Sequence, residues 1–235
     1  MDKDYSVRKT RIVGGENADV ESFRFVAEIL YTGIPFCAAF IITDKHVLTA
    51  AHCFYIVKVF QNCRDGTKIT YKLNRMLLVI GDYNVMILDE VKHHMRVIYE
   101  AHIHPNYDDV SVDNDIAVLK FETALSLGKD LKATILPPPN TEPTEGSSVV
   151  AWGWGGDSGS SLLFKVDYYH VSFAITSHGF SCGERMLPTI YTDLSRYINW
   201  IYELTKEADC KPAIHSKETY PHQKYKELNH DEFFK

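Results

Sequence analysis

The sequence predicts an all-β fold with one helix near the C-terminal end, and three observations predict it. Apolar stretches of strand length recur from residue 23 to residue 191, and the earliest of them alternates apolar and polar residues. Turns rich in glycine and proline separate these stretches. Only residues 194–204 have the spacing of an amphipathic helix, with Leu194, Ile198 and Ile201 on one stripe. The 235 residues are enough for one large β-domain or two small ones.

The expected elements follow one another along the chain. The stretch 23–42 predicts two strands, and 104–107 (HPNY) predicts a turn. The segment 136–139 (LPPP) predicts a linker outside any sheet, because proline cannot donate to a strand ladder. The polar stretch 211–235 predicts a loosely ordered tail. Further strands are expected at 77–83, 95–98, 115–120, 147–153, 162–166, 169–175 and 188–191.

Charge and hydropathy exclude two classes of partner. The net charge of −6 and the pI near 6.0 leave no basic surface for nucleic acid. The longest wholly apolar run, 36–42, is far too short to cross a membrane. Residues 1–10 have no apolar core, so we expect no signal peptide within this sequence.

Three separated motifs carry the candidate chemistry. The segment 156–160 (GDSGS) places Ser158 beside glycines, which on its own is a weak motif. Upstream, the segment 48–53 (LTAAHC) supplies His52, and the segment 113–117 (DNDIA) supplies a carboxylate. The order His, Asp, Ser is one of the known arrangements of a nucleophilic triad.

With residues 11–15 (RIVGG) in front, the chain resembles the chymotrypsin-like (trypsin-like) serine endopeptidases from about residue 12 to residue 201. The resemblance implies a peptidase domain over 12–204, built from two six-stranded antiparallel β-barrels and a C-terminal α-helix. The first barrel is expected at about 12–127 and the second at about 147–204. The resemblance also implies hydrolysis of protein or peptide substrates without a cofactor. Five cysteines around such motifs indicate a secreted protein.

The resemblance assigns the catalytic roles residue by residue. Ser158 is the expected nucleophile, and His52 is the general base and then the general acid. Asp115 is preferred to Asp113 as the orienting acid, because the family places that acid directly before an apolar run. The backbone N–H groups of Gly156 and Ser158 are expected to form the oxyanion hole.

The resemblance also implies activation by proteolysis. Residues 1–11 form the expected activation segment, cleaved after Arg11 by a trypsin-like protease. The freed amine of Ile12 would then pair with Asp157, and a buried ion pair holds only when both members are present. An ordinary basic tail is the alternative interpretation of residues 1–11.

Two further features follow from the resemblance. Cys37 and Cys53, 16 residues apart, are the expected disulfide around the histidine, and closing that loop stabilises the fold by roughly 3 kcal/mol. Four residues are expected to contact substrate: Ser177, His178, Gly179 and Thr189. The segment 205–235 is expected to be a polar C-terminal tail.

The chain departs from the family pattern in two places. His52 and Asp115 are 63 residues apart against about 45 in the triad template, and the excess lies around 60–66 with Cys63 in it. Asp115 and Ser158 are 43 residues apart against about 93, which predicts about fifty missing residues between Trp154 and Gly155. A skipped exon, a faulty gene model and a natural pseudo-protease all fit this gap.

By resemblance, the missing residues would hold two strands of the second barrel and part of the specificity pocket. They would also hold the partner of Cys182. The second barrel is therefore expected to be incomplete. The alternative function is a non-catalytic protease homologue that binds a partner protein.

A metal site is the last hypothesis to weigh. His102 and His104 share one strand face at i, i+2, which is a feasible chelating geometry. No further ligand is spaced to complete a site with them or with His93 and His94. We therefore expect solvated histidines and no bound metal.

Overall fold

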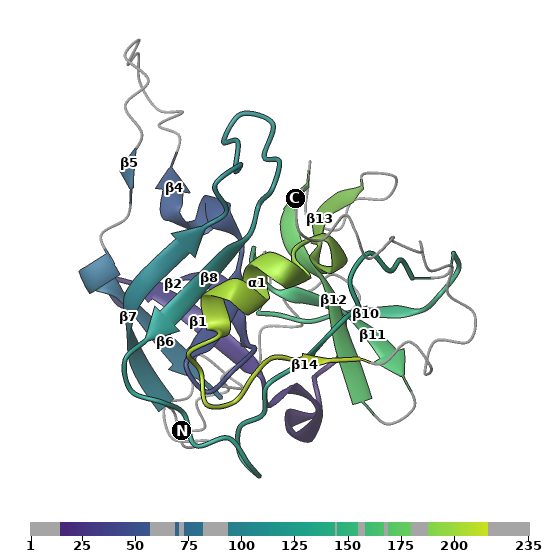
Figure 1. Cartoon of the computed structure of the whole chain (residues 1–235), viewed down its shortest axis with the longest axis horizontal. Coiled ribbons are helices and arrows are strands. Elements are labelled where there is room, and N and C mark those ends of the chain that lie inside the picture. The colour runs from purple at the N-terminus through teal and green to yellow at the C-terminus, as the bar shows by residue number, and fades with distance from the viewer. Residues whose placement is uncertain are drawn as a thin grey trace, which may run out of the picture.

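The structure is a computed structural model that describes eight stretches of the chain. These are residues 15–56, 69–70, 73–81, 94–143, 145–154, 158–166, 169–179 and 188–215. A closed barrel and a second, unclosed sheet make up the described fold (Figure 1). The prediction of an all-β chain with a complete first barrel and an incomplete second one is confirmed.

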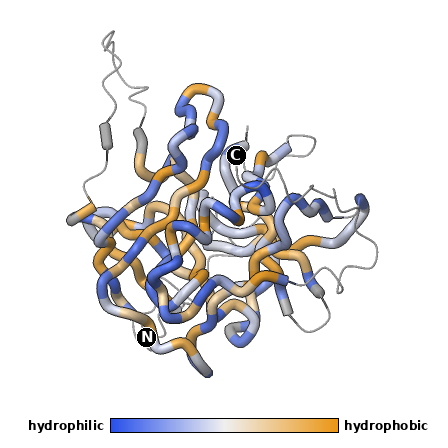
Figure 2. The backbone as a smooth tube through the Cα atoms, viewed as in Figure 1, coloured by the Kyte–Doolittle hydropathy of each residue, from blue (hydrophilic) through white to orange (hydrophobic). Residues whose placement is uncertain are grey.

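The first barrel closes in the order β1-β2-β3-β8-β7-β6, and all its pairings are antiparallel. It forms because apolar side chains point inward, where Ile29, Phe40, Leu48, Ile80 and Leu119 are fully buried. Apolar residues follow its strands, whereas the connecting loops are mostly hydrophilic (Figure 2). The strands are β1 Val26–Tyr31, β2 Ile34–Ile41, β3 His46–Thr49, β6 Met76–Ile80, β7 His94–Ile103 and β8 Ala117–Phe121.

Strands β4 (Tyr55–Ile56) and β5 (Ile69–Thr70) form a separate two-stranded ribbon that projects away from the barrel (Figure 1). The ribbon brackets the segment 60–66, where the sequence analysis places an insertion. That segment and Cys63 lie outside the described residues.

The second sheet has four antiparallel strands in the order β10-β11-β12-β13. It does not close, so β10 and β13 each pair on one side only among the described strands. A closed barrel has no free edges, whereas this sheet leaves an edge of β10 and an edge of β13 open. The strands are β10 Val149–Ala151, β11 Ser161–Val166, β12 Tyr169–Gly179 and β13 Thr189–Asp193.

Two short strands add to this sheet where none was expected. Strand β9 (Ile135–Leu136) runs parallel to β12, and β14 (Ala213–Ile214) runs parallel to β9. The linker was therefore wrongly predicted to lie wholly outside the sheet. The tail was wrongly predicted to be loose from residue 211, because an apolar pair within it reaches the backbone of β9. Residues 216–235 lie outside the described part.

The predicted helix begins as a 3₁₀ turn, Leu194–Arg196, and continues as α1, Ile198–Thr205. The Asp193 carboxylate accepts a hydrogen bond from the Ser195 N–H at 2.9 Å, which satisfies one of the free donors at the start of the turn. Leu194, Ile198 and Ile201 are buried in the core shared with the barrel, as the stripe predicts. Among the described helices, none is long and apolar enough to span a membrane.

Candidate active site

His52 lies in the short 3₁₀ helix Ala51–Phe54, directly after β3. The next residue, Cys53, forms the predicted disulfide with Cys37 on β2. One ring nitrogen of His52 lies within 4.8 Å of both sulfur atoms. Those sulfurs are bonded to each other and therefore offer no thiolate to a metal. The disulfide instead ties the backbone next to His52 to β2, because Cys53 directly follows His52 in the chain.

Asp115 receives two hydrogen bonds from His52. The His52 backbone N–H donates to Oδ1 at 2.8 Å, and ring Nδ1 lies 2.7 Å from Oδ2. Asp115 is completely buried, whereas the His52 side chain is 26% exposed. The ring is thus held at one nitrogen while part of it faces solvent. Asp113, the competing carboxylate, lies exposed in the preceding turn, where it accepts a hydrogen bond from Ser111.

The hydrogen-bond donors around Asp115 determine the direction in which the pKa of its carboxyl is shifted. Burial alone would raise the pKa of the Asp115 carboxyl, because the charged form loses its hydration. The hydrogen bonds and the charge of His52, with a further hydrogen bond from Ser177, outweigh burial and hold this pKa below its usual value. Asp115 is therefore an ionised, acceptor-only carboxylate at neutral pH.

The turn before β8 explains why Asp115 faces inward. Asn114 adopts a left-handed backbone conformation with φ of 55°, which asparagine tolerates better than most residues. Its side chain donates to the Asn106 carbonyl at 2.9 Å and accepts from the Tyr197 hydroxyl at 3.0 Å. On the other side, the Thr192 hydroxyl donates to the Asp115 carbonyl at 3.0 Å. Thr192 was not predicted as part of the site, because the strand was expected only over 188–191 and burial along β13 does not alternate.

Ser158 lies where the two sheets meet. Its carbonyl accepts a hydrogen bond from the Ala38 N–H on β2 at 2.9 Å and lies 4.0 Å from Cys53 Sγ. The next N–H, of Gly159, donates to the Thr176 carbonyl on β12 at 2.9 Å. The serine segment therefore bridges the barrel and the second sheet beside the disulfide that carries His52.

Gly159 is required for this approach. Its φ is +89°, and a Cβ there would lie 2.3 Å from both the Ala38 carbonyl oxygen and Thr49 Oγ1. Real Cβ atoms essentially never come so close to backbone atoms. Only glycine therefore allows Ser158 to sit this near to β2.

Ser177, on β12, also contacts Asp115. Its hydroxyl donates to Asp115 Oδ2 at 2.5 Å, and Nδ1 of His178 lies 3.0 Å from Ser177 Oγ. Ser177 is buried, whereas His178, Gly179 and Thr189 are exposed on the paired ends of β12 and β13. The four expected substrate-contact residues thus lie on one pair of strands, and three of them face solvent.

Several expected site residues cannot be placed. Arg11, Ile12, Gly156 and Asp157 lie outside the described residues, as does Cys182. Within the described part, no hydrogen bond joins the Ser158 hydroxyl to His52. Such bonds are often long in enzymes without substrate and tighten only when substrate binds.

The histidines of the rejected metal hypothesis have structural partners. His102 Nε2 lies 2.8 Å from a Glu100 carboxylate oxygen. The ring of His104 packs edge-on against Tyr197 and Trp200, with centroids 5.1 and 5.0 Å apart, and burial lowers the pKa of His104. Both side chains are partly exposed, and the ring contacts of His104 are a feature that the sequence did not predict. His93 lies outside the described residues.

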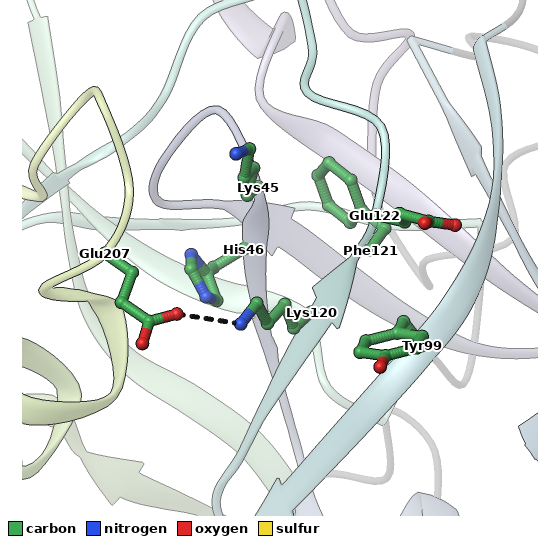
Figure 3. A pocket seen from close by; sticks show the side chains of 7 residues that line it. All are labelled: Lys45, His46, Tyr99, Lys120, Phe121, Glu122 and Glu207. Carbon is green, nitrogen blue, oxygen red and sulfur yellow. Dashed lines mark hydrogen bonds and ion pairs between the residues drawn. The ribbon is translucent and has the colours of Figure 1, made fainter.

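A hollow of about 250 Å³ lies away from this site, beside β3 and β8. Lys120 meets Glu207 there at 3.2 Å, next to His46 (Figure 3). His46 is 1% exposed, and burial, followed by the nearby charge of Lys120, lowers the pKa of His46 to about 4. Its Nδ1 bonds Thr43, whereas Nε2 has no partner in the described structure. Charges of both signs line this hollow, and none of the residues lining it belongs to the His52 site.

Beside a closed barrel and an open second sheet, the chain has a hydrogen-bonded pair of His52 and Asp115 and the backbone segment of Ser158. These features are typical of serine-protease homologues. The family model described as Trypsin matches residues 12–156, more than half of the chain. The chain belongs to the trypsin family. Ser158 lies just beyond the matched residues.

The relatives include insect and mammalian proteins. Venom serine protease 34 of Apis mellifera is 32% identical over 165 residues, which is 67% of this chain and 37% of that protein. Trypsin V-B of Rattus norvegicus is 28% identical over 240 residues, covering 82% of this chain and 89% of the relative. Trypsin V-A of the same species is 23% identical over 244 residues, covering 84% of this chain and 90% of the relative. This chain therefore spans little more than a third of the venom protease but most of each rat trypsin.

Proposed function

We propose that the chain is a serine endopeptidase that hydrolyses peptide bonds through an acyl-enzyme intermediate. The observation that carries the proposal is the pair of hydrogen bonds between His52 and Asp115, next to the disulfide against which Ser158 is held. This arrangement fits acyl transfer because it supplies a nucleophile, a base and a group that orients the base.

The proposed chemistry assigns one role to each residue. Ser158 Oγ attacks the substrate carbonyl carbon, and His52 Nε2 takes the hydroxyl proton. His52 then returns that proton to the leaving amine, and a water molecule repeats the sequence on the ester. Asp115 holds the Nδ1–H tautomer of His52 and stabilises the imidazolium without taking its proton.

The remaining roles follow the family pattern. The N–H groups of Gly156 and Ser158 form the oxyanion hole, and cleavage after Arg11 lets Ile12 pair with Asp157. Ser177, His178, Gly179 and Thr189 form the substrate-contacting strands, and a trypsin-like protease is the activating partner. The disulfide supports a secreted protein, because such bonds persist in oxidising compartments.

The missing segment is part of the proposal. The open edges that β10 and β13 leave in the second sheet support the loss of two strands before Ser158. The alignment with Trypsin V-A is 244 residues long, which is more than the 235 residues of this chain. It nevertheless covers only 84% of the chain. Such an alignment has gaps on the side of this chain, which also supports a shortened sequence.

A second candidate is a non-catalytic homologue that binds a partner protein. The exposed strand ends at His178, Gly179 and Thr189 favour it, because a complete specificity pocket would have a second wall there. Peptide hydrolysis separates the two candidates. We expect chain cleaved after Arg11 to release fragments from a mixed peptide library, and Ser158→Ala to release none. Absence of turnover in both proteins would support the binding module.

A further inference from the structure

Residue 178, between Ser177 and Gly179, is a histidine. His178 is exposed on β12, next to the buried Ser177. Its Nδ1 lies 3.0 Å from Ser177 Oγ, within hydrogen-bond distance.

The hydrogens available on Asp115 and Ser177 determine which atom donates in each hydrogen bond. Asp115 is ionised and can only accept, so the single hydrogen of the Ser177 hydroxyl points to Asp115 Oδ2. Ser177 Oγ must then act as the acceptor toward its other neighbour. His178 therefore carries a hydrogen on Nδ1 and donates it to Ser177.

The three bonds form a continuous chain. It runs from His178 Nδ1–H to Ser177 Oγ, from Ser177 to Asp115 Oδ2, and from Oδ2 to Nδ1–H of His52. Oδ2 is thus shared by Ser177 and His52. Hydrogen bonds in such a chain polarise one another, and a hydroxyl that accepts a bond becomes a stronger donor.

We propose that His178 is a positioning residue of this site: its Nδ1–H holds the Ser177 hydroxyl on Asp115 and thereby keeps Asp115 Oδ2 in contact with His52. The effect of His178 on catalysis rests on the proposed function. The hydrogen-bond chain itself does not depend on whether Ser158 reacts. His178 itself touches none of the atoms that react.

Two variants test the role. His178→Phe keeps a ring of similar size and removes the donor. His178→Asn can place an amide N–H close to the position of Nδ1 and restores the donor. The Ser158→Ala background allows the hydrogen-bond chain to be measured by nuclear magnetic resonance, whether or not the protein is an enzyme.

We expect ¹⁵N chemical shifts to show His178 in the Nδ1–H tautomer. The Nδ1 proton of His52 should exchange with water several-fold faster in His178→Phe and return towards the wild-type rate in His178→Asn. An Nε2–H tautomer of His178, or the same exchange rate in all three proteins, would overturn the proposal.

Kinetics on the reactive protein provide the second readout. His178→Phe should lower kcat by about tenfold, the effect of weakening one hydrogen bond, and His178→Asn should recover most of it. Equal kcat for both variants would remove the positioning role. If Ser158 proves unreactive, the proposed function fails, and the tautomer and exchange measurements still decide whether the hydrogen-bond chain exists.

Discussion

His52 binds Asp115 through both its backbone and its ring, at 2.8 and 2.7 Å, although 63 residues separate them in the sequence. The two bonds use different oxygens of one carboxylate. A hydrogen bond from the ring alone would only orient the imidazole of His52. The second bond, from the backbone N–H, also fixes the position of the His52 main chain relative to Asp115. The contact thus joins the loop after β3 to the loop before β8.

Replacing Asp115 with asparagine should remove catalysis with little change in shape. The amide can still bond His52, but it favours the wrong tautomer of the ring and carries no charge for the imidazolium. We expect kcat to fall by about 10⁴-fold, the loss typical of this change in a Ser-His-Asp triad. Asp113→Asn is the matched control, since Asp113 is an exposed carboxylate in the same turn, and it should keep full activity. Equal losses in both variants would contradict the assignment of Asp115.

Gly159→Ala should destabilise the protein and displace Ser158. The added Cβ would meet the Ala38 carbonyl oxygen and Thr49 Oγ1 at 2.3 Å, so the backbone must shift. We expect a loss of at least about 3 kcal/mol in the free energy of unfolding.

Gly33→Ala is the control for backbone strain alone, because Gly33 has φ of +81° and nothing within 4 Å of its Cβ position. It should cost about 1 to 2 kcal/mol in urea unfolding. If Gly159→Ala cost no more than this control, Ser158 would not be held against β2 as described.

His46 should make the fold sensitive to acid. Its pKa is about 4 in the folded protein because of burial, against 6.5 for the free side chain. As the pH falls through this window, the unfolded chain binds a proton that the folded protein does not, so stability decreases. We expect His46 to account for a loss of about 2 kcal/mol between pH 7 and pH 5.

Urea unfolding at both pH values measures this loss. His46→Phe cannot titrate and should flatten the dependence on pH. The same slope in the wild type and His46→Phe would show that folding does not lower the pKa of His46.

The second sheet should open more readily than the barrel. The barrel has no free edge, whereas β10 and β13 have one each among the described strands. One face of the second sheet also relies on a small apolar cluster, in which only Val171 and Phe173 are fully buried members. Hydrogen exchange followed by mass spectrometry should show slow amides up to β8 and faster ones from β10 onward, with a step near the prolines 137–139. Uniformly slow exchange would mean that the second sheet is closed in solution.

The features that sequence predicted are those set by local periodicity or by a motif. The stripe of Leu194, Ile198 and Ile201 located the helix because three apolar residues at helical spacing need one buried face. The family pattern, which places the acid directly before an apolar strand, located Asp115 as the residue that contacts His52. The chain's resemblance to a known family then supplied the closed barrel and the disulfide.

The features that could not be predicted from the sequence depend on contacts between segments that are far apart along the chain. Strands β9 and β14 have two residues each, too few to show any period, and they pair only because the linker and the tail lie side by side. The bond between His178 and Ser177 was missed for a related reason. It depends on the bond from Ser177 to Asp115 on another sheet, which no pattern around residue 178 reveals.

We propose that Ser158 becomes an activated nucleophile once the chain has been cut after Arg11. Reaction with a fluorophosphonate, followed by intact-mass and peptide mapping, tests it most directly. We expect one phosphonyl group on Ser158 in the cleaved wild type. The Arg11→Gln protein treated in the same way should remain unlabelled, because the Ile12 amine is not freed. An unlabelled Ser158 in fully cleaved wild type, under conditions that label a trypsin control completely, would contradict the account.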